Sequence, residues 1–91
     1  MYVRRNMESL KEQFEAPFSD KNITGHIWRF DKNISLETAM QTAISKPFCG
    51  AFVYTVDSRV FYKTITSEEA IIRLKDDVKK TEGHTVYVKK I

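Results

Sequence analysis

The sequence predicts an α+β fold, in which a small antiparallel sheet of four to five strands has a helix packed across it. The first observation is a stretch whose apolar residues recur at helical spacing, and the second is a pair of β-branched and aromatic runs directly after it. The third is the order of the patterns, which is strand, helix, strand, strand, helix, strand, preceded by a short N-terminal helix. A chain of 91 residues forms one domain with one small core.

The N-terminal segment 6–15 has the pattern of a short helix that ends before Pro17. Its apolar residues, at i, i+3 and i+7, are Met7, Leu10 and Phe14. Because so short a helix is marginal in isolation, we expect this stripe to dock on the domain. Residues 1–16 are therefore predicted to form an N-terminal helical extension, and residues 17–91 the α+β domain.

A loop and a first strand follow. Residues 16–22 are polar and contain Pro17, which is typical of a loop. Residues 25–30 read as a strand, in which successive side chains point to opposite faces of the sheet. This alternation predicts one face with His26, Trp28 and Phe30 and another with Ile27 and Arg29.

The central helix and hairpin carry the clearest patterns. Ser35 is the predicted N-cap of a helix that reaches Ile44, and Pro47 marks its stop. The apolar face of this helix consists of Leu36, Ala39, Met40, Ala43 and Ile44. Strands are predicted at residues 49–56 and 60–65, and the short connection between them makes a hairpin against which the helix packs.

A second helix and a closing strand complete the prediction. Residues 66–69 have the Ser/Thr-x-x-Glu form of a capping box. The apolar stripe after it consists of Ala70, Ile71, Leu74 and Val78. Gly83 is expected in the left-handed conformation at the end of this helix. Residues 84–91 alternate as a strand whose buried residues are mainly Val86, Val88 and Ile91.

Composition and reactive residues predict a protein that is not an enzyme and needs no metal or cofactor. Cys49 is the only cysteine, and neither it nor His26 or His84 belongs to a recognisable catalytic or metal-binding motif. Cys49 is expected to be a small buried hydrophobic residue. The net charge of +3 is spread among mixed signs, so it does not by itself imply nucleic acid.

The same features predict a cytoplasmic location and no membrane segment. No signal peptide is visible, no apolar stretch approaches the length of a membrane span, and a single cysteine suits a reducing compartment. A secreted chain whose leader has been removed is the alternative. The sequence leaves the identity of the ligand and the oligomeric state open.

Six residues on the first strand and the hairpin are predicted to form a ligand-binding surface. Aromatic and arginine side chains give most contact energy per residue in protein interfaces. The competing interpretation places each of them in the core or at a strand edge with only its polar tip in water. The six are Trp28, Arg29, Tyr54, Arg59, Tyr62 and Lys63.

Five runs of the sequence carry a family resemblance. They are Ile23-Thr24-Gly25-His26-Ile27, Ser35-x-x-x-Ala39-x-x-x-Ala43, Cys49-Gly50-Ala51-Phe52-Val53-Tyr54, Val60-Phe61-Tyr62-Lys63 and Tyr87-Val88-Lys89-Lys90. Together they resemble the PAN/apple domains, in which one helix lies across a curled antiparallel sheet. The resemblance implies a non-catalytic module that binds a protein or a carbohydrate.

The resemblance also implies which residues replace the disulfides of that family. Ala39, Ala43 and Val60 stand where family members have cysteines, and Cys49 is the one that is kept. Ala39 is then expected to pack against Val60, and Cys49 to lie opposite Ala43. The second helix is not a usual part of that fold.

A ferredoxin-like RNA-binding domain is the alternative that the order of elements allows. In that case the hairpin aromatics stack on bases and must be exposed on one face of the sheet. The PAN/apple-like interpretation instead places them under the helix that ends at Ile44. These aromatics are Phe52, Tyr54, Phe61 and Tyr62.

Overall fold

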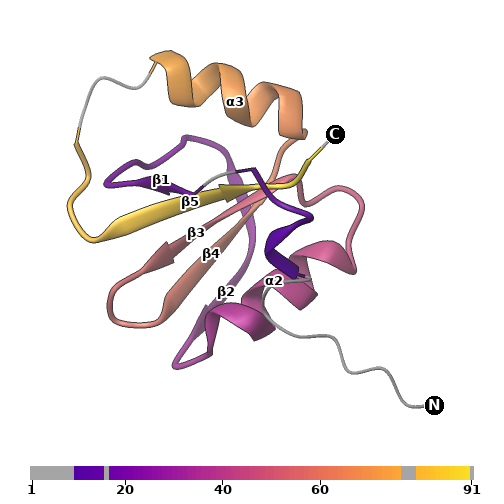
Figure 1. Cartoon of the computed structure of the whole chain (residues 1–91), viewed down its shortest axis with the longest axis vertical. Helices are drawn as coiled ribbons and strands as arrows, with labels where there is room; N and C mark the ends of the chain where they lie inside the picture. Colours follow the sequence, from indigo (N-terminus) through magenta and orange to yellow (C-terminus); the bar gives the residue numbers. More distant parts are fainter. Residues whose placement is uncertain (1–9, 16, 77–79, 91) are drawn as a thin grey trace.

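The computed structural model describes residues 10–15, 17–76 and 80–90. In these residues one five-stranded sheet combines with two helices, which confirms the predicted α+β class (Figure 1). The elements are β1 (Phe18–Ser19), β2 (His26–Lys32), α2 (Leu36–Ile44), β3 (Ala51–Thr55), β4 (Arg59–Thr64), α3 (Ser67–Asp76) and β5 (His84–Val88). The strand order is β1-β5-β3-β4-β2, and every neighbouring pair is antiparallel.

This strand order places the two helices on opposite faces of the sheet. β2 and β3 are parallel with β4 between them, and β4 and β5 are parallel with β3 between them. The connection through α2 passes β4 on its way from β2 to β3, and the connection through α3 passes β3 on its way from β4 to β5. Both move in the same direction across the sheet, but β2 and β3 run antiparallel to β4 and β5. Right-handed crossovers, which proteins use almost without exception, then put α2 on one face and α3 on the other.

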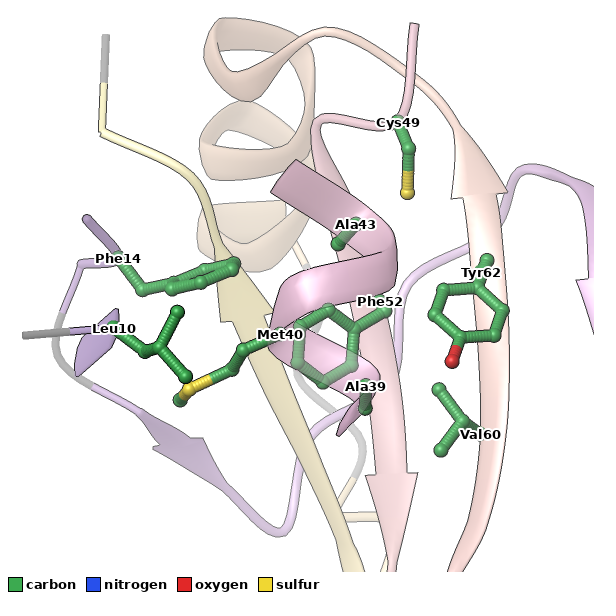
Figure 2. Close-up of a cluster of buried hydrophobic side chains, with 9 residues drawn as sticks. All are labelled: Leu10, Phe14, Ala39, Met40, Ala43, Cys49, Phe52, Val60 and Tyr62. Carbon is green, nitrogen blue, oxygen red and sulfur yellow. The ribbon is translucent and has the colours of Figure 1, made fainter. Parts of the chain in front are cut away.

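Two hydrophobic clusters confirm this arrangement, one on each face. The α2-side cluster consists of Leu10, Phe14, Ala39, Met40, Ala43, Cys49, Phe52, Val60 and Tyr62 (Figure 2). The α3-side cluster consists of Ile23, Ala51, Val53, Ile65, Ala70, Leu74, Val86 and Val88. Because β3 gives Phe52 to the first cluster and its neighbours Ala51 and Val53 to the second, its side chains fill both faces in alternation.

The predicted helix starts and the hairpin are confirmed. Ser35 caps α2, since its Oγ accepts a hydrogen bond from the amide of Thr38 at 3.2 Å. Thr66 acts in the same way for α3, because its Oγ1 accepts from the amide of Glu69 at 3.1 Å. β3 and β4 pair as an antiparallel hairpin, with register from Ala51↔Lys63 to Tyr54↔Val60.

The predicted alternation of the first strand is wrong. The register against β4 shifts between Ile27 and Arg29, as in a β-bulge. Trp28 therefore packs on the α2-side cluster, whereas Phe30 lies opposite Phe61, which packs on the α3-side cluster. The prediction that Trp28 and Phe30 share a face fails because one extra residue reverses the period-two pattern.

Two further predictions need correction at the ends of elements. The loop predicted over 16–22 contains the short strand β1, which pairs with β5 and is too short to give a sequence pattern. Gly83 has the expected positive φ of 82°, but it lies in the turn that leads directly into β5. The left-handed conformation of Gly83 therefore belongs to the turn before β5 and not to the end of α3.

The N-terminal segment belongs to the core. Met7 and the predicted start of its helix lie outside the described residues, as do Val78 of the second helix and Ile91 of the closing strand. Leu10 is helical, but the chain then turns, and Phe14 forms a bridge with Lys89 beside β5, so the predicted helix to Glu15 is wrong. The predicted docking is confirmed, because Leu10 and Phe14 are buried in the α2-side cluster.

Candidate functional site

Three of the six predicted surface residues are core or partly core residues. Tyr62 is fully buried in the α2-side cluster, and burial raises its pKa to about 12. Trp28 packs on the same cluster, with 5.6 Å between its ring and that of Tyr62. Tyr54 is half-buried, and its hydroxyl donates to the backbone carbonyl of Ile34 at 2.9 Å. These aromatics stabilise the α2 side of the sheet.

Lys63 is also buried, although the sequence predicts that it belongs to the ligand-binding surface. The residue is 6% exposed, and its side chain packs beside Gly25. Burial lowers the pKa of its ammonium group. Because Arg73 Nη1 donates to the carbonyl of Thr24 at 2.6 Å, the chain segment before β2 is held over this lysine.

Arg29 and Arg59 are the two predicted residues that are exposed. Each forms an ion pair of 2.9 Å within its own strand region, Arg29 Nε with Asp31 Oδ2 and Arg59 Nε with Asp57 Oδ2. Arg59 also lines an open hollow of about 280 Å³ between the hairpin tip and the turn before β5. Exposed ion pairs of this kind contribute little to stability, so both arginines are available for contacts.

The structure adds an exposed apolar strip on β2 that the sequence did not single out. Ile27 is 43% exposed and Phe30 is 47% exposed. The Phe30 ring lies 5.0 Å from that of Phe61 on β4. Because α3 packs against β5 and the α3-side cluster, these side chains of β2 and β4 lie beside the covered part of that face. The sequence pattern does not place Ile27 and Phe30 on one face, because the bulge between Ile27 and Arg29 shifts the alternation by one residue.

β2 is also the last strand of the sheet. It has seven residues, and no strand among the described residues pairs with its outer side. The backbone groups on that side are therefore free to pair with another strand. We call this free edge, together with Ile27, Arg29, Phe30 and Asp31, the β2 surface.

Cys49 lies in a closed environment on the other side of the sheet. It is fully buried, and burial raises the pKa of its thiol. The Trp28 indole and the Lys89 ammonium group act in the opposite direction on this pKa. Lys89 Nζ donates to the carbonyl of Lys46 at 2.8 Å, which fixes the cation near the loop that carries Cys49. The sequence predicted the burial but not this cation.

Cys49 is expected to react slowly with a thiol reagent in the native protein. Nucleophilic attack requires the thiolate, and a raised pKa leaves the neutral thiol as the main form at neutral pH. Native labelling should therefore be slower than labelling in denaturant, and its rate should keep rising as the pH passes the ordinary thiol value of 9.0. Rapid stoichiometric labelling at neutral pH would contradict this, and mass spectrometry of the adduct measures it.

Metal and membrane features are not found in the part of the chain that the structure describes. Within it, no group of three or more His, Cys, Asp or Glu side chains is placed to hold a metal ion. The described helices are also too short and too polar to cross a bilayer. Comparison of the chain with protein-family models, with curated proteins and with solved structures finds no match.

Proposed function

We propose that this domain is a non-catalytic module that binds a protein through the β2 surface. The observation that carries the proposal is a seven-residue edge strand whose outer side is unpaired in the described structure and whose Ile27 and Phe30 are more than two-fifths exposed. An added strand can bond to such an edge through its backbone, while apolar side chains supply contact area. Exposed apolar surface beside a polar rim is typical of interaction sites.

The positions of the hairpin aromatics favour this proposal over RNA binding. Base stacking requires aromatic rings exposed on one sheet face. Phe52 and Tyr62 are instead fully buried beneath α2, and Phe61 is half-buried against the α3-side cluster. A protein partner at the strand edge needs none of these rings to be free.

The resemblance to PAN/apple domains is part of the same proposal. Its support is that Ala39, Ala43, Cys49 and Val60, the four positions that correspond to family cysteines, all belong to the α2-side cluster (Figure 2). α2 lies across an antiparallel sheet, as that family requires, and α3 is an addition on the opposite face. Among the protein and carbohydrate ligands that the resemblance implies, the free strand edge favours a protein.

A photo-crosslinking experiment tests the proposed function. The full chain carries p-benzoylphenylalanine in place of Phe30 and, as a control, in place of Ile72, which is 51% exposed on α3. We expect position 30 to form an adduct with one protein chain, identified by mass spectrometry, and position 72 to form none. A second copy of this chain counts as such a protein.

The partner that is identified must then bind the purified domain. Phe30→Ser is expected to weaken that binding by about tenfold, because it removes the central apolar contact. Ile72→Ser should leave the affinity unchanged. Adducts only with nucleic acid or glycan, or no adduct at position 30, would overturn the proposal.

A further inference from the structure

We infer that the β2 surface binds the β2 surface of a second copy of this chain, so that two sheets join as an antiparallel pair of β2 strands. This inference rests on the proposed function, because it names the protein that binds. Most homodimers have a two-fold axis, and such an interface must be complementary to itself. The sequence of β2 meets that requirement in one register.

The charges of β2 select this register. If the two-fold axis passes beside Phe30, then Arg29 of each copy lies directly opposite Asp31 of the other. An axis beside Arg29 would instead oppose two arginines, and an axis beside Asp31 would oppose two aspartates. Opposite charges across a strand pair are favourable and like charges are unfavourable, so the register centred on Phe30 is preferred.

The positions of the side chains on the monomer fit this register. Arg29 and Asp31 pair with Tyr62 and Val60 of the α2-side cluster, so both lie on the α2 side of the sheet. They already form an ion pair of 2.9 Å within one chain. In the dimer the two pairs would stand side by side, with each charge next to charges of the opposite sign along the strand and across it.

The other face of the dimer would be apolar. Phe30 lies opposite Phe61, on the α3 side, with 5.0 Å between their rings. At the axis the two Phe30 rings would meet, each supported from behind by a Phe61 ring. This contact would cover side chains that are half-exposed in the monomer, and aromatic pairs are favourable in such interfaces.

The bulge restricts the length of this pairing. The register against β4 is regular from Arg29 to Lys32, and Asn33 has a positive φ of 58° that ends the strand. With the axis beside Phe30, Lys32 would lie opposite Trp28 in the bulge, so only Arg29 to Asp31 of each copy would pair regularly. Because so short an edge buries little surface, we expect a dimer with micromolar to millimolar affinity.

Charge reversal tests the register on the full chain by sedimentation velocity and light scattering over a concentration series. Arg29→Glu places two carboxylates opposite each other at both ends, and Asp31→Arg does the same with two cations. Each single variant is expected to weaken dimerisation by at least about tenfold, because opposed like charges are costly in an interface. The double variant should dimerise as the wild type does.

A mixture of the two single variants gives the sharpest result. In a heterodimer of Arg29→Glu and Asp31→Arg, every opposed pair again has opposite signs, so the mixture should dimerise about as well as the wild type, although each variant alone dimerises more weakly. Arg59→Glu is the matched control, because Arg59 forms a similar exposed ion pair with Asp57 but lies outside β2. It should leave dimerisation unchanged.

Three results would overturn the inference. These are a wild-type chain that stays monomeric up to millimolar concentration, single variants that dimerise as well as the wild type, and a mixture that stays monomeric. If the chain is monomeric but the probe at position 30 captures a different protein, self-pairing fails and the proposed function stands. If that probe captures no protein at all, the proposed function fails as well.

Discussion

Ala39→Asp is expected to abolish the cooperative folding of the domain. Ala39 is fully buried in the α2-side cluster. An aspartate there would bury a carboxylate among apolar groups, and an unpaired buried charge costs several kcal/mol. A small domain is stabilised by only about 5 kcal/mol or somewhat more, so this single change is enough to unfold it.

Circular dichroism during thermal and urea unfolding measures this effect. Gln41→Asp is the control, because Gln41 is exposed on the same helix and the substitution there costs only helix propensity, about 0.5 kcal/mol. A soluble Ala39→Asp protein with a cooperative transition would contradict the burial of this position. It would also remove the support that the cluster gives to the PAN/apple resemblance.

Gly50→Ala is expected to destabilise the domain by about 3 kcal/mol. A Cβ atom at Gly50 would lie 2.7 Å from the backbone nitrogen of Ser67 and still closer to the carbonyl oxygen of Ile65. The Ile65 carbonyl cannot move away easily, because Gly50 N donates a hydrogen bond to it at 2.8 Å. The added methyl group must therefore push the start of β3 away from the start of α3.

Gly25→Ala is the matched control for this substitution. A Cβ atom there would lie 3.6 Å from the nearest atom, the Nη1 of Arg73, which is ordinary van der Waals contact. Neither Gly25 nor Gly50 has a positive φ, so the comparison isolates the steric effect. Equal stability of the two variants in denaturant unfolding would show that the close approach at Gly50 is not required.

The sequence predicts the elements of this fold better than it predicts their faces. α2, the hairpin and α3 are local structures, and Ser35, Thr66 and the apolar spacing specify where they start within one or two residues. The faces of β2 depend on one inserted residue near Trp28, and a bulge leaves no clear sign in the alternation. A one-residue shift reverses every side chain that follows.

The same limit applies to the candidate site. Arg29 and Arg59 were predicted to be exposed, and they are. The sequence places Lys63 in the predicted binding surface because of its reach and charge, but its side chain is buried beside the segment at Gly25. Lys89 lies near Cys49 only because β5 pairs with β3. The burial of Lys63 and the position of Lys89 both depend on contacts between distant parts of the chain, which a local sequence pattern cannot predict.

The position of β3 determines how the domain can open. β3 has β4 and β5 as its two neighbours in the sheet, and its side chains enter the α2-side cluster on one face and the α3-side cluster on the other. Detachment of either helix would expose apolar side chains of this strand to water. Because one strand supplies both clusters, each helix depends on a sheet that the other helix helps to stabilise, and the two layers cannot unfold as independent units.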